Sequence, residues 1–125
     1  MNVSTAMKSN IIKMYLVKFL FNMHFIAAIL VPFFTQWGRI TISEILFITA
    51  WGRIWVFVLE IPTGTIADFF SRKLSLLLGV ISFIIALGVY ISYPSIYIFL
   101  LAEFICSVSY TFMSGASEAL IYDSL

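Results

Sequence analysis

This chain has few charged residues, and four of them fall within the stretch EIPTGTIADFFSRK. Glu60, Gly64 and Asp68 recur at every fourth position, which places them on one face of a helix. Arg72 and Lys73 follow one turn later. Two carboxylates and two cations at the end of an apolar run can form ion pairs or exchange protons. The chain shows no nucleophile beside a base, no glycine-rich phosphate loop and no cluster of metal ligands, so we expect no enzyme.

The composition is that of a membrane protein. Of the 125 residues, 62% are hydrophobic and 10% are charged, whereas soluble domains carry about 25% charged residues. The net charge of +1 provides no basic surface for nucleic acid. Cys106 is the only cysteine, which excludes an internal disulfide and a CxxC metal or redox pair. We therefore expect a lipid bilayer as the surrounding partner, with no cofactor, no metal and no nucleic acid.

Four apolar runs reach or approach the length of about 20 residues that a helix needs to cross a bilayer. We expect transmembrane helices at residues 11–34, 41–67, 74–92 and 96–122. The segments that join them are short: residues 35–40, 68–73 and 93–95. Such links leave room only for antiparallel neighbours. The sequence therefore predicts an all-α membrane protein with four transmembrane helices in a single, partial domain.

The basic residues that flank these runs predict the orientation in the membrane. One side carries Lys8, Lys13, Arg72 and Lys73, and the other carries only Arg39. The N-terminal residues 1–10 and the loop 68–73 are therefore expected to be cytoplasmic, in a multi-pass protein of the cell membrane. Four aromatic residues are then expected to anchor the outer interface: Trp37, Tyr90, Tyr93 and Tyr97.

The second run carries local signals at its start and near its end. TISE predicts a capping box, in which Thr41 caps the helix and Glu44 reaches back to it. Pro62 removes a backbone donor and leaves the carbonyl of Val58 without its usual partner, which should bend or loosen the helix. Gly64 on the same turn should let a neighbouring helix approach closely.

Four ionisable residues fall inside the predicted spans. Lys18 and Glu60 each lie about 10 Å from the cytoplasmic end of their helices. Arg53 and Glu103 lie about 11 Å from the outer end of theirs. Because a charge in a bilayer costs several kcal/mol unless it is paired or wet, we predict pairs of Lys18 with Glu60 and of Arg53 with Glu103. These pairs either hold the helices together or let Glu60 or Glu103 exchange a proton.

The loop between the second and third predicted helices resembles the signature loop of the major facilitator superfamily. That signature reads roughly glycine, three residues, aspartate, a basic residue, any residue, glycine, arginine and a basic residue. Gly64, Asp68, Arg72 and Lys73 match it in spacing and in place. The flanking segments EIPTG and SGASEALIYDSL are similar to those of a bacterial, drug-exporter-like branch. The resemblance covers nearly the whole chain and about a third of a family protein.

The resemblance implies a conformational latch at the cytoplasmic surface. In the family, the aspartate and the arginine join an acid at the cytoplasmic end of the fourth helix and stabilise the outward-facing state. Asp123 is the matching acid here. Phe69 replaces a basic residue of the signature and Ser71 replaces its second glycine. Because a serine Cβ makes a positive-φ turn costly, we expect the latch in a weakened form.

The family fold has twelve helices in two halves, each built from inverted three-helix repeats, with the substrate between the halves. The chain would supply the first four helices of such a fold. Its first and fourth helices would line the cavity, which directs Asn22, His24 and Glu103 toward the substrate path. The resemblance thus implies alternating-access transport, as the N-terminal part of a proton-coupled exporter of small molecules. The remaining C-terminal helices and a small-molecule substrate would be its partners.

Two other functions remain open from the sequence. A self-assembling four-helix exporter, similar to the small multidrug resistance family, would have a similar length. That family relies on a glutamate within its first helix, where this chain carries Lys18. The third possibility is a truncated membrane fragment that does not transport. A stable dimer in mild detergent would distinguish the self-assembling exporter from the other two.

Overall fold

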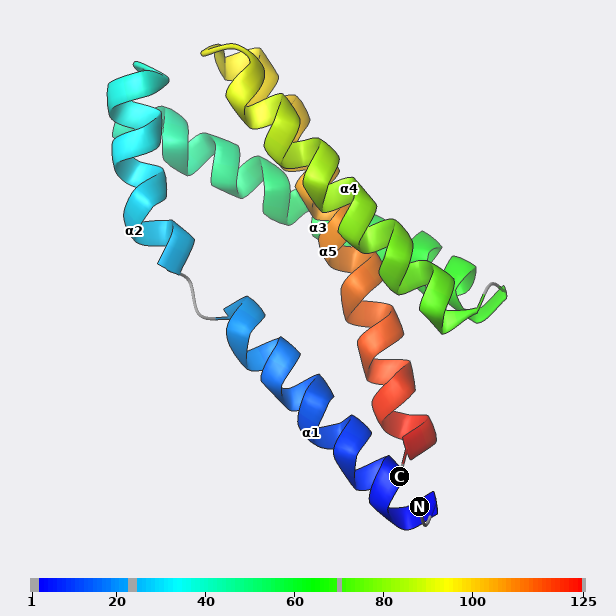
Figure 1. Ribbon diagram of the computed structural model, residues 1–125. Helices are drawn as coiled ribbons and strands as arrows, with labels where there is room; N and C mark the ends of the chain where they lie inside the picture. Colours follow the sequence, from blue (N-terminus) through cyan, green and yellow to red (C-terminus); the bar gives the residue numbers. More distant parts are fainter. Residues whose placement is uncertain (1–2, 23–24, 70, 125) are drawn as a thin grey trace.

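The computed structural model describes residues 3–22, 25–69 and 71–124. The helices, in chain order, are α1 (Val3–Asn22), α2 (Phe25–Pro32), the π-helix η1 (Phe33–Trp37), α3 (Ile42–Phe69), α4 (Arg72–Ser92) and α5 (Ile96–Ser124) (Figure 1). No strand occurs within these ranges, and only short links separate the helices. The predicted all-α class is confirmed.

Three of the helices are long and apolar enough to cross a membrane. These stretches are Ile42–Ile66 in α3, Arg72–Ser92 in α4 and Ile96–Ala116 in α5. Within the first predicted run, 11–34, the structure describes α1 as far as Asn22 and helix again from Phe25, and α1 begins well before the run, at Val3. The early turns of α1 are polar, whereas the apolar helical stretch Ala28–Trp37 is short for a span. A span formed by the first run remains a prediction.

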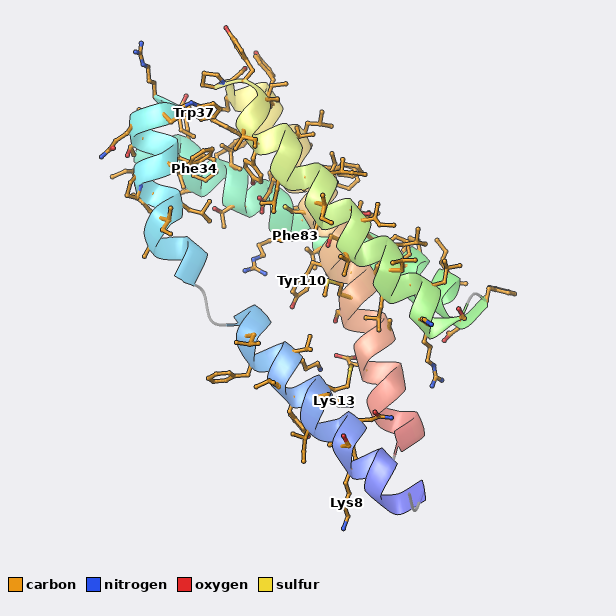
Figure 2. The ribbon with its side chains drawn as sticks, viewed as in Figure 1. Lys8, Lys13, Phe34, Trp37, Phe83 and Tyr110 are labelled. Carbon is orange, nitrogen blue, oxygen red and sulfur yellow. The ribbon has the colours of Figure 1, made fainter. Side chains whose placement is uncertain are left out.

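Helix α5 is the centre of the bundle. It packs along both α4 and α3, whereas α3 and α4 make few contacts with each other, and α1 contacts α5. The α2–α3 link and the α4–α5 link lie at one end of the bundle, and the start of α1 lies beside the end of α5 at the other (Figure 1). Figure 2 places Phe34 and Trp37 at the first of these ends and Lys8 and Lys13 near the second. The three long helices therefore run antiparallel in turn, as the short links predict.

The bundle buries small hydroxyl residues together with apolar ones and exposes large apolar side chains on its outside. Its buried side chains include several small hydroxyl residues: Thr63, Ser75, Ser107, Ser109 and Thr111. Large apolar side chains are exposed on α3, with Phe57 at 77% and Ile61 at 79%. Even in α5, only 28% of the most apolar stretch is buried. Small and polar residues at helix contacts and apolar residues outside them are the pattern of helices packed within lipid. The chain is a membrane-embedded protein.

An aromatic cluster closes the end of the bundle where α4 joins α5. Phe99, which is fully buried, contacts Phe34 with ring centroids 5.1 Å apart. The π-helix η1 brings Phe33, Phe34 and Trp37 to this point. Gly38 follows η1 directly, and a Cβ there would lie 2.8 Å from the Phe99 ring. The absence of a side chain at Gly38 therefore lets the α2–α3 link lie against α5.

The predicted loop 68–73 is mostly helical. Helix α3 continues to Phe69, and α4 begins at Arg72. Ser71 is the N-cap of α4, with φ −63° and ψ 140°, and its Oγ accepts a hydrogen bond from the Leu74 N–H at 3.2 Å. Serine is a favoured N-cap residue, and this backbone conformation needs no glycine. The replacement of the signature glycine by Ser71 thus supplies a cap instead of a positive-φ turn.

The predicted capping box at the start of α3 is confirmed. The Glu44 carboxylate accepts hydrogen bonds from the Thr41 N–H at 2.7 Å and from the Thr41 hydroxyl at 2.9 Å. The Thr41 hydroxyl oxygen in turn accepts one from the Glu44 N–H at 3.3 Å. Reciprocal bonds of this kind satisfy backbone donors that the first helical turn leaves unpaired.

Replacing Thr41 with alanine should therefore destabilise the start of α3 by about 1 kcal/mol. Faster amide hydrogen exchange over residues 42–45 would show the loss. Thr49→Ala is the matched control, because the Thr49 hydroxyl bonds only within its own helix, to the Ile45 carbonyl. Equal exchange in both variants would contradict a capping role for Thr41.

Candidate functional site

Glu103 lies where α3, α4 and α5 meet, and its carboxylate contacts both neighbouring helices. From α4, the Tyr90 hydroxyl donates a hydrogen bond to Glu103 Oε2. From α3, Gly52 faces the same side chain, since a Cβ at position 52 would lie 2.6 Å from Glu103 Cγ. Gly52 is buried, whereas Tyr90 and Glu103 are partly buried. The carboxylate is thus held between a phenol on one helix and a bare backbone on another.

Ser107 fixes α5 to α3 one turn beyond Glu103. Its hydroxyl lies 2.9 Å from the carbonyl oxygen of Gly52 and 2.8 Å from that of Glu103, and it donates to these two acceptors. A hydrogen bond between helices inside a bilayer contributes about 0.6 kcal/mol on average. Ser107 therefore adds a modest but direct link at the level of Glu103.

Arg53 is the basic residue that the sequence pattern predicts to lie nearest to this site. It follows Gly52 on α3 and is exposed, and its charge acts on Glu103. The structure thus brings the predicted partners Arg53 and Glu103 into electrostatic range. The direct hydrogen bond to the Glu103 side chain comes from Tyr90 instead.

Tyr90 is turned into the bundle, although we expected it at the outer interface. Its ring lies 5.8 Å from that of Phe34 and 6.1 Å from that of Phe99, measured between centroids. The other aromatic residues of the predicted belt are more exposed, with Tyr93 at 65% and Tyr97 at 79%. A buried phenol needs a hydrogen-bond partner, and the Glu103 carboxylate supplies it. This acceptor explains why Tyr90 departs from the belt.

Two indole rings of α3 form an aromatic group with Phe104, the residue that follows Glu103 on α5. Trp55 packs edge-on against Phe104 of α5, with centroids 4.7 Å apart, and against Trp51 at 5.5 Å. The Nε1 atoms of Trp51 and Trp55 are buried and have no hydrogen-bond partner within the described part of the chain.

The second predicted pair, Lys18 with Glu60, stays a prediction. Lys18 lies on α1, and α1 packs against α5. Glu60 is exposed on α3, in the C-terminal half of that helix, which also carries Asp68. Helix α5 contacts both α1 and α3.

The latch residues lie at the junction of α3 and α4, as their spacing predicts. Asp68 is exposed in the last turn of α3, whereas Arg72 is partly buried and Lys73 exposed in the first turn of α4. One expectation is not met within the described part of the chain: no atom of another helix lies within 4 Å of the place where a Gly64 Cβ would be. Close helix contacts occur instead at Gly52 and Gly79, because α5 crosses α3 and α4 there.

Three predicted residues cannot be placed in this site. Asn22 ends α1 and Asp123 lies near the end of α5, but their side chains are outside the described part of the structure. His24 lies outside the described residues altogether. The cavity role of Asn22 and His24 and the latch role of Asp123 therefore stay predictions.

Comparison of the chain with protein-family models, curated proteins and solved structures gave no match. The resemblance to the facilitator superfamily thus rests on the motif and its placement. Within the described residues, no group of three His, Cys, Asp or Glu side chains gathers at a possible metal site.

Sequence reasoning missed the two residues that contact Glu103 most closely, Tyr90 and Gly52. A usable signal was present in the short SYPS link, which makes α4 and α5 antiparallel neighbours. Tyr90 then lies near the end of one helix and Glu103 about 10 Å into the next, a difference in depth that a tyrosine side chain can span. Chemically, the arrangement can hold a carboxyl within the apolar layer and exchange a proton on it.

Proposed function

We propose that this chain acts in transmembrane transport by alternating access, as the N-terminal portion of a major facilitator type secondary transporter. Proton-coupled efflux of small molecules is the proposed activity, in the cell membrane with the N-terminus cytoplasmic. The observation that carries the proposal is the position of the Gly64, Asp68, Arg72 and Lys73 pattern. It spans the junction of two long apolar helices, where the resemblance expects it.

The arrangement of charges at this junction supports a latch. Asp68 ends α3 and Arg72 begins α4, so both side chains leave the bundle at the same end. Helix α5 runs toward that end from the α4–α5 link and carries Asp123 in its last turns. A carboxylate and a guanidinium held on separate helices can form bonds in one conformation and release them in another.

Glu103 supports the proton-coupled part of the proposal. Ionisable residues within membrane helices are costly, and they mark ion or proton pathways. Glu103 meets two further helices through Tyr90 and Gly52. A change in its protonation would therefore alter contacts among all three long helices, which is the property that a coupling residue needs.

The test is the effect of Asp68→Asn on the balance between inward-facing and outward-facing states. Tyr110 lies midway along α5 and is 45% exposed (Figure 2), so a cysteine placed there in a Cys106→Ser background reports access from each side. In the protein as its native cell makes it, we expect Asp68→Asn to shift labelling by an impermeant maleimide toward the cytoplasmic side. The latch favours the outward-facing state, and a two-fold to ten-fold change corresponds to about 0.4 to 1.4 kcal/mol.

Glu118→Gln is the control, because it removes an exposed carboxylate from α5 without touching the motif. Equal access from both sides in the wild type, Asp68→Asn and Glu118→Gln would overturn the transporter proposal. A stable dimer of the chain in mild detergent, with unchanged access, would favour the small self-assembling exporter. Monomeric chain with unchanged access would favour a membrane fragment that does not transport.

A further inference from the structure

The contact between Tyr90 and Glu103 links a polar side chain of α4 to an ionisable side chain of α5. It joins the last turns of α4 to the first half of α5. The ring of Tyr90 is fixed by Phe34 and Phe99, so its hydroxyl has a defined position. A fixed donor beside a carboxylate favours one protonation state of that carboxylate over the other.

We propose that Tyr90 is a positioning residue that holds the Glu103 carboxylate against Gly52 and sets the pH at which this carboxylate takes up a proton. When Glu103 is ionised, it accepts the Tyr90 hydrogen bond, and α3, α4 and α5 are held together at one point. When Glu103 is protonated, the carboxyl no longer needs this donor, and the link between α4 and α5 weakens. The use of this switch in transport rests on the proposed function, but the switch itself does not.

The groups that face Glu103 from each helix support this assignment. From α4 comes the Tyr90 phenol, and from α3 comes the charge of Arg53. On α5 itself, the Cys106 thiol lies within electrostatic range of Glu103. Of these groups, Tyr90 alone donates a hydrogen bond to the carboxylate. Arg53 adds a positive charge near the site, whereas Tyr90 also fixes the place of the carboxylate.

Space at Gly52 makes the position of the carboxylate specific. A Cβ on residue 52 would overlap the Glu103 side chain, so the carboxylate occupies volume that any other residue would fill. The adjacent Ser107 hydroxyl binds the Gly52 carbonyl and keeps the two backbones at this separation. The carboxylate therefore lies at a defined position beside Gly52 of α3 and accepts its hydrogen bond from Tyr90 of α4.

The experiment measures protonation of Glu103 in the whole 125-residue chain in lipid nanodiscs. Dicyclohexylcarbodiimide adds to a protonated carboxyl: the acid proton moves to a carbodiimide nitrogen, and the carboxylate oxygen bonds to the central carbon. The adduct rearranges to a stable acylurea, and mass spectrometry of the peptide that contains Glu103 locates it. Labelling across a pH series gives the midpoint at which Glu103 loses its proton.

Tyr90→Phe keeps the ring and removes only the donor. Because the ionised carboxylate then loses a hydrogen bond, we expect the labelling midpoint to move to higher pH by about 1 unit. Tyr97→Phe, on an exposed ring, should leave the midpoint unchanged. An unchanged or lower midpoint in Tyr90→Phe, or an equal shift in Tyr97→Phe, would overturn the proposal.

Two further variants separate positioning from simple packing. Phe34→Leu removes one of the two rings that fix Tyr90 but keeps the phenol and the second ring, so it should lower thermal stability and move the midpoint by much less than Tyr90→Phe does. Fluorotyrosine at position 90 is a stronger donor of nearly the same size and should move the midpoint to lower pH, which tests the proposal even if Tyr90→Phe fails to fold. A shift in Phe34→Leu as large as in Tyr90→Phe, or no shift with fluorotyrosine, would contradict it. All these readouts need no transport, so they can succeed or fail independently of the proposed function.

Discussion

Phe99→Ala should cause the largest loss of stability of any single truncation in the bundle. Phe99 is fully buried and packs against the rings of Phe34, Trp37 and Tyr90. In lipid, little transfer energy is lost on truncation, because the separated helix would also meet an apolar medium. The cost comes from the void and the lost contacts, and we expect about 2 to 3 kcal/mol.

Cys106 provides a built-in reporter for this prediction. It is a free, partly buried thiol on α5, so its reaction with a maleimide dye in detergent micelles follows opening of the bundle. Phe99→Ala should lower the temperature of half-reaction by about 10 °C. Phe57→Ala is the matched control, since Phe57 is 77% exposed and faces outward. Similar curves for the two variants would contradict a core role for Phe99.

Gly79→Leu should separate α4 from α5. A Cβ at Gly79 would lie 2.6 Å from Met113 Cγ and 3.2 Å from the Ser109 carbonyl oxygen. The Ser109 hydroxyl also donates to the Gly79 carbonyl at 2.6 Å, and this bond requires the same close approach. Overpacking of a tight contact costs about 1 to 3 kcal/mol, and the loss of the Ser109 bond adds about 0.6 kcal/mol.

Gly88→Leu is the control on the same helix, because no other group lies within 4 Å of the place where its Cβ would be. Thermal unfolding monitored by circular dichroism should show a clear loss of stability for Gly79→Leu. It should show no loss, or a small gain from helix propensity, for Gly88→Leu. Equal effects at the two glycines would mean that helix propensity, rather than the contact with α5, sets the outcome.

The sequence was sufficient for the features that depend on local pattern. Hydrophobic length predicted α3, α4 and α5, and the TISE pattern predicted the bonds between Thr41 and Glu44. The same approach began the first helix at residue 11, because apolar content alone does not show that the more polar residues before it are helical. Helices α3 and α4 both extend into the predicted loop, and Ser71 caps the start of α4 there. The family pattern, which has glycine at this position, did not suggest a cap.

The candidate site was harder to predict, because it depends on which helices touch. Depth along the helices placed Arg53 near Glu103 but could not show that Tyr90 would be the direct donor. Gly64 looked like a packing glycine because it lies on the turn of Pro62, yet the close contacts occur at Gly52 and Gly79. The sequence shows which positions are glycines and could allow a close helix contact. It does not show where a second helix crosses, and the contact forms only at such a crossing.

The central position of α5 also determines the order in which the bundle can assemble. Helices α3 and α4 contact α5 extensively but contact each other little. During synthesis, these two helices can therefore enter the membrane one after the other without forming a stable pair. They become a single unit only when Phe99, Glu103 and Ser109 have left the ribosome and entered the membrane with α5. Until that moment, Gly52 and Gly79 expose backbone to lipid, which gives quality-control proteases and chaperones a period in which to recognise the unfinished chain.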